Sequence, residues 1–181
     1  MGSMTAAQVN QARVAAQTRL DVLPLRLAHV RGVATAAAAL RGHFDVITGD
    51  CLVAAAWLHD IGHAPSVRMT GFHPVDGALF ARREGFHELV VSLVAFHSGA
   101  PAEARERGIS AFSAFSEPPQ RVLDALTFCD LTTGPDGSTV AAHDRLQEVL
   151  QRYEPDDPVH RAVYCSRDEL LATVERVHGW I

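Results

Sequence analysis

The 181-residue sequence contains few cysteines and no excess of basic residues, and each shortage argues against a class of protein. The three cysteines, Cys51, Cys129 and Cys165, form no Cys-x-x-Cys pair. Their odd number and wide spacing indicate reduced thiols that pack as small apolar groups, which favours a cytoplasmic location. The formal net charge of -5 provides no general attraction to phosphate backbones, so we do not expect binding to long nucleic acids.

Long hydrophobic runs are also missing. The longest apolar stretches, such as residues 89–96, are far shorter than the roughly 20 residues that cross a bilayer, and no signal-peptide core follows the first methionine. We therefore expect a protein that is neither inserted into a membrane nor exported. The start Gly2-Ser3-Met4 is consistent with a remnant of an expression tag in front of a natural start at Met4.

The alternation of apolar and polar residues that is typical of strands does not persist anywhere. Apolar residues make up 48% of the chain and charged residues 20%, which is ordinary for a folded domain. Segments rich in Ala, Leu, Val and Arg recur between Gly, Pro and Asp breaks, so the sequence predicts an all-α, compact single-domain helical bundle over residues 1–181. We expect helices near residues 5–20, 25–40, 51–60, 73–84, 87–98 and 120–131, and two or three more after a turn at 134–137.

Three local features refine this prediction. Asp50 is expected to cap the helix 51–60, whose lack of a polar face indicates that it lies buried at the centre of the fold. The segment 101–113 is expected to be a polar, mobile loop. Ser166 and Glu169 have the spacing of a capping box and are expected to start the last helix.

Several of the ten histidines lie at positions that a purely structural role explains poorly. The pair His59-Asp60 closes the apolar helix 51–60, and a buried polar pair needs partners because an uncompensated buried charge costs several kcal/mol. Imidazole and carboxylate together suit Mn, Fe(II), Co or Zn. His29 and Asp130 lie in two other apolar helices and can face inward, although each taken alone is also compatible with an ordinary structural role.

The order of His29, His59-Asp60 and Asp130 on separate helices resembles the HD superfamily of metal-dependent phosphohydrolases. The string Trp57-Leu58-His59-Asp60-Ile61-Gly62-His63 is similar to the signature of that family. The resemblance covers about residues 25–133, and residues 151–155 also resemble small bacterial members. It implies an HD-type fold with a metal-binding core at about 25–133 and C-terminal helices at about 138–181. It further implies that the four residues bind a divalent metal, with a transition metal (Fe, Mn, Co or Zn) favoured over Mg.

His73 and His97 suggest a second ion, because many family members with two additional histidines hold two metals. The resemblance then implies that Asp60 bridges the ions, that His29, His59 and Asp130 hold the first, and that His73 and His97 hold the second. A two-metal site suits phosphoryl transfer because it stabilises both the attacking and the leaving oxygen. The alternative is that His73 only caps a helix and that His97 is a favourable cation at a helix end.

Three further residues are candidates for contact with the substrate. His63 stands where many two-metal relatives have a lysine, and an imidazole could protonate the leaving oxygen or bind the phosphate. Arg26 precedes His29 by one helical turn and could neutralise a phosphate oxygen, as in the nucleotidase branch of the family. Thr133 follows Asp130 closely enough to line the site. Asp60, His63 and Arg26 are therefore the predicted catalytic residues.

The sequence and the resemblance together predict hydrolysis of a small phosphorylated substrate, a nucleotide or another phosphate ester, by a metal-activated water. We found no P-loop, no G-x-S-x-G elbow and no HExxH helix. Two alternatives stay open: a dinuclear-iron oxygenase of the HD type, and a non-catalytic regulatory module that binds a nucleotide or a partner. The sequence fixes neither the substrate nor the oligomeric state.

Overall fold

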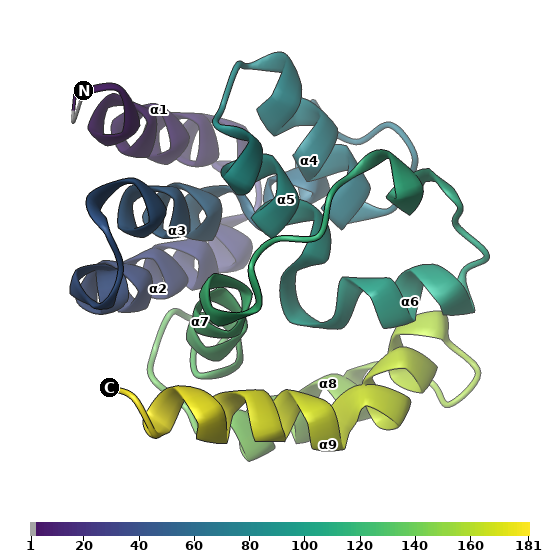
Figure 1. Cartoon of the computed structure of the whole chain (residues 1–181). Helices are drawn as coiled ribbons and strands as arrows, with labels where there is room; N and C mark the ends of the chain where they lie inside the picture. Colours follow the sequence, from purple (N-terminus) through teal and green to yellow (C-terminus); the bar gives the residue numbers. More distant parts are fainter. Residues whose placement is uncertain (1–2) are drawn as a thin grey trace.

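The computed structural model describes residues 3–181, and the first two residues, which include most of the expected tag remnant, lie outside this range. Within it the chain is helical throughout (Figure 1), as predicted. A lone bridge between Thr133 and Thr139 is the closest approach to a strand in the described range. The helices are α1 (Ser3–Arg19), α2 (Pro24–Leu40), α3 (Val46–Leu58), α4 (His73–Arg83), α5 (Glu88–Phe96), α6 (Ala100–Glu106), α7 (Gln120–Leu131), α8 (Ala142–Arg152) and α9 (Pro158–His178), with 3-10 turns η1 (Arg41–His43), η2 (Ile61–His63), η3 (His97–Gly99) and η4 (Ala111–Ala114).

Helix α3 lies at the centre of the fold, as its lack of a polar face predicts. It packs against α1, α2, α5 and α7, and residues 49–56 are all buried. A helix that is apolar on every side gains most when other helices cover it completely. The C-terminal end of α3, which carries His59 and Asp60, is therefore fixed deep inside the molecule.

Asp50 does not cap α3, contrary to the prediction. Asp45 does, because its carboxylate accepts hydrogen bonds from the backbone of Ile47 and Thr48. The helix starts one turn earlier than expected, and Asp50 lies inside it with its carboxylate paired to Arg41. An ion pair with η1 thus replaces the predicted capping role.

Two other local predictions were wrong. Much of the expected loop at 101–113 is helical, since α6 and η4 both overlap it. Ser166 lies in the middle of α9, where its hydroxyl donates to the carbonyl of Ala162. The last helix instead begins after Asp157, which accepts from the backbone of Val159, with Pro158 in the first turn.

The cysteines meet the prediction only in part. Cys51 and Cys129 are buried and reduced, and burial raises their pKa values to about 11 and about 12. Cys165 is exposed on α9, so it does not serve as a core residue. Across the described residues, no helix combines the length and the hydrophobicity that a membrane crossing requires.

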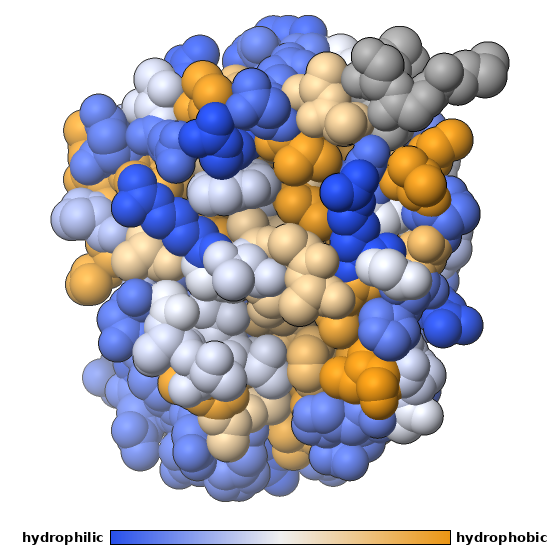
Figure 2. Space-filling model, turned by 90° about the vertical axis from the view of Figure 1, so that its left-hand side faces the viewer, coloured by the Kyte–Doolittle hydropathy of each residue, from blue (hydrophilic) through white to orange (hydrophobic). Residues whose placement is uncertain are grey.

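The C-terminal helices complete the fold from below in the view of Figure 1. Helix α9 packs on α6, α7 and α8, and a small second apolar cluster joins α7, α8 and α9 through Leu131, Leu146 and Leu170. Figure 2 shows the side of the molecule where α2 ends and α3 begins, with hydrophilic side chains around a central band of paler to hydrophobic ones. Because α8 and α9 both pack against α7, these two C-terminal helices lie next to the helix that carries Asp130.

Candidate metal centre

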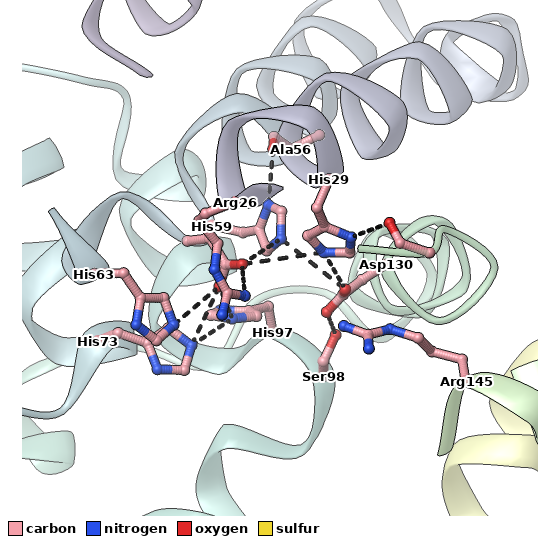
Figure 3. A network of polar contacts seen from close by, with 12 residues as sticks. Arg26, His29, Ala56, His59, His63, His73, His97, Ser98, Asp130 and Arg145 are labelled. Atoms are coloured by element: carbon pink, nitrogen blue, oxygen red, sulfur yellow. Dashed lines mark hydrogen bonds and ion pairs between the residues drawn. The ribbon is translucent and has the colours of Figure 1, made fainter. Parts of the chain in front are cut away.

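Six predicted ligands from five segments of the chain meet in one place (Figure 3). His29 comes from α2, His59 and Asp60 follow α3, His73 starts α4, His97 follows α5, and Asp130 lies near the end of α7. Four of the six are buried, and His73 and Asp130 are partly buried. With the exception of His59 they line a cavity of about 350 Å³. The structure thus brings together residues that are up to about one hundred positions apart in the sequence.

Backbone carbonyls fix the orientation of three of the histidine rings. The Nδ1 atoms of His29, His59 and His97 lie 3.1, 2.8 and 2.7 Å from the carbonyl oxygens of Gly134, Ala56 and Val94, respectively. A carbonyl oxygen can only accept a hydrogen bond, so each Nδ1 carries the hydrogen. In a neutral ring the Nε2 atom then offers a lone pair, which is the arrangement that a metal ligand needs. His29 Nε2, 3.0 Å from Asp130 Oδ1, donates to that carboxylate when its ring is charged and offers its lone pair when the ring is neutral.

The first group of potential ligands consists of His29, His59 and Asp130, whose ligand atoms all lie within 4.8 Å of one another. His29 Nε2 is 3.0 Å from Asp130 Oδ1, and His59 Nε2 is 4.0 Å from the same oxygen. His59 Nε2 is buried and has no hydrogen-bond partner among the described residues. A buried, unpartnered lone pair that faces carboxylates is costly in an empty protein and is satisfied by a bound cation.

The second group consists of Asp60, His63 and His73. The Nε2 atoms of His63 and His73 lie 3.6 and 3.4 Å from Asp60 Oδ1, and their rings stack at 4.1 Å between centroids. His97 Nε2 lies 4.0 Å from the same oxygen and 3.3 Å from His73 Nε2. All three histidines thus surround one oxygen of Asp60, while its other oxygen lies 3.6 Å from His59 Nε2.

The carboxylates in this cluster are held in their charged form. Burial by itself would raise the pKa of Asp60, but Arg26 and the surrounding histidines lower it well below its ordinary value. For Asp130, the opposing effect of burial is likewise outweighed, chiefly by the hydrogen bond from His29, and its pKa is also lowered. The site therefore presents two carboxylates ready to bind a cation.

Most of the histidines are held neutral. Burial lowers the pKa of His59 to about 4, and burial also lowers the pKa values of His63 and His73. His29 differs: burial opposes its charged form, but the hydrogen bond to Asp130 and that carboxylate's charge raise its pKa. Neutral imidazole is the form that ligates metals, so the protein favours ligation at most of these positions.

Two close backbone contacts position the ligands. Gly62 lies against the start of α4, where an added Cβ would come within 2.1 Å of the carbonyl oxygen of His73. Gly137, at φ +83°, lies against α2, where a Cβ would come within 2.5 Å of the carbonyl oxygen of Ala28. The first contact keeps His63 beside His73, and the second keeps the turn that contains Gly134 beside His29.

Arg26 lies where the sequence predicts it, but Thr133 does not contribute to the cavity. Arg26 Nη1 is 2.5 Å from Asp60 Oδ2, and the guanidinium lines the cavity. Thr133 follows α7, and its buried hydroxyl donates to the carbonyl of Cys129 in that helix, 2.7 Å away. Thr133 is also absent from the cavity wall.

Sequence reasoning missed two residues of the site, Ser98 and Arg145. Ser98 Oγ donates a short hydrogen bond to Asp130 Oδ2, and its backbone adopts a left-handed conformation with φ 44°. Arg145 reaches from α8 toward Ser98 and Asp130, as Figure 3 shows. Ser98 could have been predicted from the sequence, because it lies between His97 and Gly99. No pattern in the sequence indicates Arg145.

The donor set fits one or two divalent cations. Imidazole nitrogens and carboxylate oxygens in this mixture suit Fe, Mn, Co or Zn better than Mg, which prefers oxygen ligands and water. The unpartnered Nε2 of His59 and the shared position of Asp60 between the two groups are the features that a metal would satisfy.

Comparison with known proteins gives one match. The family model described as HD domain matches residues 26–128, which is more than half of the chain and includes five of the six predicted ligands. Neither the curated proteins nor the solved structures contain a significant match.

Proposed function

The chain belongs to the HD domain family, and on this basis we propose that it is a metal-dependent phosphohydrolase that acts on a nucleotide or another small phosphate ester. The observation that carries the proposal is the convergence of two ligand groups, His29, His59 and Asp130 on one side and Asp60, His63 and His73 on the other. A regulatory module without activity would not need both groups to be intact.

We assign the first ion to His29, His59, Asp60 and Asp130, and the second to Asp60 and His73 with His97. Asp60 would bridge the two, since its two oxygens face the two groups. Cations held there would lower the pKa of a water molecule and polarise a phosphoryl oxygen. His63, partly exposed beside Asp60, is close enough to complete the second group or to act on the substrate.

The remaining chemistry belongs to side chains. Arg26 borders the cavity next to Asp60, so its guanidinium can hold a non-bridging phosphate oxygen with two parallel hydrogen bonds. His63 is held neutral by burial, so it would relay a proton between solvent and the leaving oxygen rather than carry a permanent charge. Asp130, which contacts Ser98 and His29, would orient the attacking water by accepting a hydrogen bond from it.

The test combines elemental analysis with phosphate release. Protein purified without chelator should contain one or two equivalents of a transition metal, and a panel of phosphate esters with Mn, Fe(II), Co and Mg should identify a hydrolysed substrate. Asp60→Asn should lower turnover by at least about 100-fold and reduce the metal content, because it removes the shared charged ligand. Asp168→Asn, at a position with a side chain 93% exposed, is the matched control.

Two outcomes would contradict the proposal. One is an Asp60→Asn protein with full metal content and full activity. The other is an iron-containing protein that consumes oxygen with an organic substrate and releases no phosphate from any ester, which would favour the oxygenase alternative.

A further inference from the structure

A second cavity, of about 630 Å³, adjoins the metal-binding cavity. Five residues line both cavities, and three of them are arginines: Arg26, Arg145 and Arg152. The rest of the second cavity is apolar and is formed by the start of α2 and the turn before α8, through Val22, Leu23, Pro24, Leu25 and Pro135. A wall that is rich in guanidinium groups therefore separates the metal centre from an apolar recess.

The charge of this wall is only partly neutralised by the carboxylates that contact it. Arg145 and Arg152 both contact the carboxylate of Glu148 on the same helix, so two positive charges share one negative charge. Arg26 faces Asp60, which the metal would also engage. In a protein with a net charge of -5, this local excess of positive charge marks the position where an anion is stabilised.

The type of basic side chain indicates which anion this wall would bind. All 16 side chains counted as Lys or Arg are arginines, so any phosphate that a permanently charged side chain binds in this protein is bound by a guanidinium group. A planar guanidinium binds two oxygens of one phosphate at once, and it stays charged at any physiological pH. The side chain of Arg145 is only 10% exposed and that of Arg152 is 37% exposed, so both are partly ordered by the wall before any ligand binds.

The apolar recess indicates what is attached to this anion. Leu25 and Val22 have exposed fractions of 66% and 63%, although they are large apolar residues. Together with Pro24 and Pro135 they offer a surface that a flat, apolar ring would cover, and removing such surface from water is favourable. The second cavity and the arginine wall thus suit a phosphate joined to a ring.

We propose that Arg145 and Arg152 bind a second phosphate next to the reacting one that Arg26 holds, and that the apolar recess binds the base, so that the substrate is a nucleoside diphosphate or a longer nucleoside polyphosphate. This rests on the proposed function for the reacting phosphate. In the hydrolysis, water forms a new P–O bond to the terminal phosphorus, the P–O bond to the bridging oxygen breaks, and the proton of the water ends on the released phosphates.

Binding to metal-free protein tests the arginine wall without any turnover. After chelator treatment, pyrophosphate should bind at least about ten-fold more tightly than orthophosphate, because only pyrophosphate spans several guanidinium groups. Arg152→Ala should weaken pyrophosphate binding by about ten-fold, and Arg152→Lys should restore part of the loss because it keeps the charge but not the fork. Arg31→Ala, an exposed arginine on α2 that lines neither cavity, is the matched control.

The recess is tested by adding the nucleoside. Adenosine diphosphate should bind the metal-free protein more tightly than pyrophosphate does. Leu25→Ser should weaken the binding of the nucleotide more than that of pyrophosphate, because it removes apolar surface only from the part that contacts the ring. Leu25 is exposed, so this change should leave the thermal midpoint within about 2 °C of that of the unchanged protein.

Failure of this inference is distinguishable from failure of the proposed function. If pyrophosphate binds no more tightly than orthophosphate, or if Arg152→Ala weakens the binding of both anions equally, the arginine wall does not bind a second phosphate. This conclusion would hold whatever substrate the enzyme hydrolyses. If no ester is hydrolysed with any metal but the binding results hold, the proposed reaction is wrong and the anion site stands. With active protein, kcat/KM should favour adenosine diphosphate over the monophosphate by about ten-fold, and Arg152→Ala should reduce that preference.

Discussion

His59 links the protonation of the site to the stability of the metal-free protein. Burial lowers its pKa to about 4 in the folded chain, whereas an unfolded chain has the ordinary value of 6.5. Between these values the unfolded state binds a proton that the folded state does not, so the free energy of unfolding must fall as the pH decreases from about 6.5 to about 4. His29, whose pKa is raised, does not contribute in this window, because it is protonated in both states below about 6.5.

Urea denaturation of chelator-treated protein at pH 7, 6 and 5 measures this effect. Each unit of pKa difference between the two states corresponds to about 1.4 kcal/mol. His59→Asn should make the pH dependence less steep, with the remaining slope coming from His63 and His73, whose pKa values burial also lowers, whereas the exposed His143→Asn should leave it unchanged. An identical slope in all three proteins would show that His59 is not kept neutral in the folded state.

Ser98 combines backbone strain with a contact to a ligand. Its left-handed conformation costs a non-glycine residue about 1 kcal/mol, while its hydroxyl holds Asp130. Ser98→Ala and Ser98→Gly both remove the hydroxyl and should weaken metal binding by about ten-fold or more, the usual effect of losing a group that orients a ligand. Only the glycine variant also relieves the strain, so it should unfold at a higher temperature than the alanine variant.

Metal titration against a chelating dye and thermal unfolding measure the two effects separately. Unchanged metal affinity in both variants would mean that Ser98 does not position Asp130. Equal thermal stability of the two would mean that the strain is absorbed elsewhere.

At the level of elements, Gly62 sets the contact between η2 and α4. An added Cβ would lie 2.1 Å from the backbone oxygen of His73, so Gly62→Ala must push the two elements apart. His63 and His73 would then move away from Asp60. We expect the metal content to fall by up to one equivalent, with the ion between His29, His59 and Asp130 retained, as measured by elemental analysis.

Gly42→Ala is the control, because a Cβ at Gly42 would meet nothing within 4 Å. Loss of all metal in the Gly62 variant would contradict the assignment of His73 to a separate second ion.

The elements also show what the sequence could predict. Helix α3 was predicted as central because every side of it is apolar, and α4 was predicted to start at His73-Pro74, as it does. The cap of α3 was assigned wrongly because Gly49-Asp50 resembles a break. In the fold, Asp50 is paired to Arg41, and Gly49 lies where a Cβ would be 2.7 Å from the Arg41 carbonyl oxygen.

The site residues also divide into those that a local sequence pattern predicts and those that only the packing of the helices reveals. The four principal ligands and the two additional histidines were predicted because they share a pattern and a family signature. Ser98 and Arg145 were missed because their importance comes only from proximity: Ser98 meets Asp130 across 32 positions, and Arg145 belongs to α8, beyond the matched residues. Contacts of this kind depend on how helices pack, which local sequence does not encode.

At the level of the whole molecule, metal binding and folding should be coupled. The ligands come from α2, α4 and α7 and from the segments that follow α3 and α5, so ions held there would link segments that are far apart in the sequence. Binding to the folded state alone stabilises it by about 2.7 kcal/mol when the free ion is at 100 times its Kd. Chelation should therefore lower the thermal midpoint by about 5 to 10 °C for a domain of this size.

Adding back Mn or Fe(II) should restore the midpoint, and Asp60→Asn protein should show a smaller response. A midpoint that does not change with chelator would mean that no ion is bound at this centre.

The carbonyl contacts of His59 and His97 have one more consequence. The two rings donate to Ala56 and Val94, in the last turns of α3 and α5, so each imidazole closes the end of its own helix. An ion that draws in the opposite nitrogen also tightens these two turns, because the ring is rigid. Amide protons at the ends of α3 and α5 should then exchange with solvent more slowly when the centre is loaded, which makes two backbone segments reporters of its occupancy.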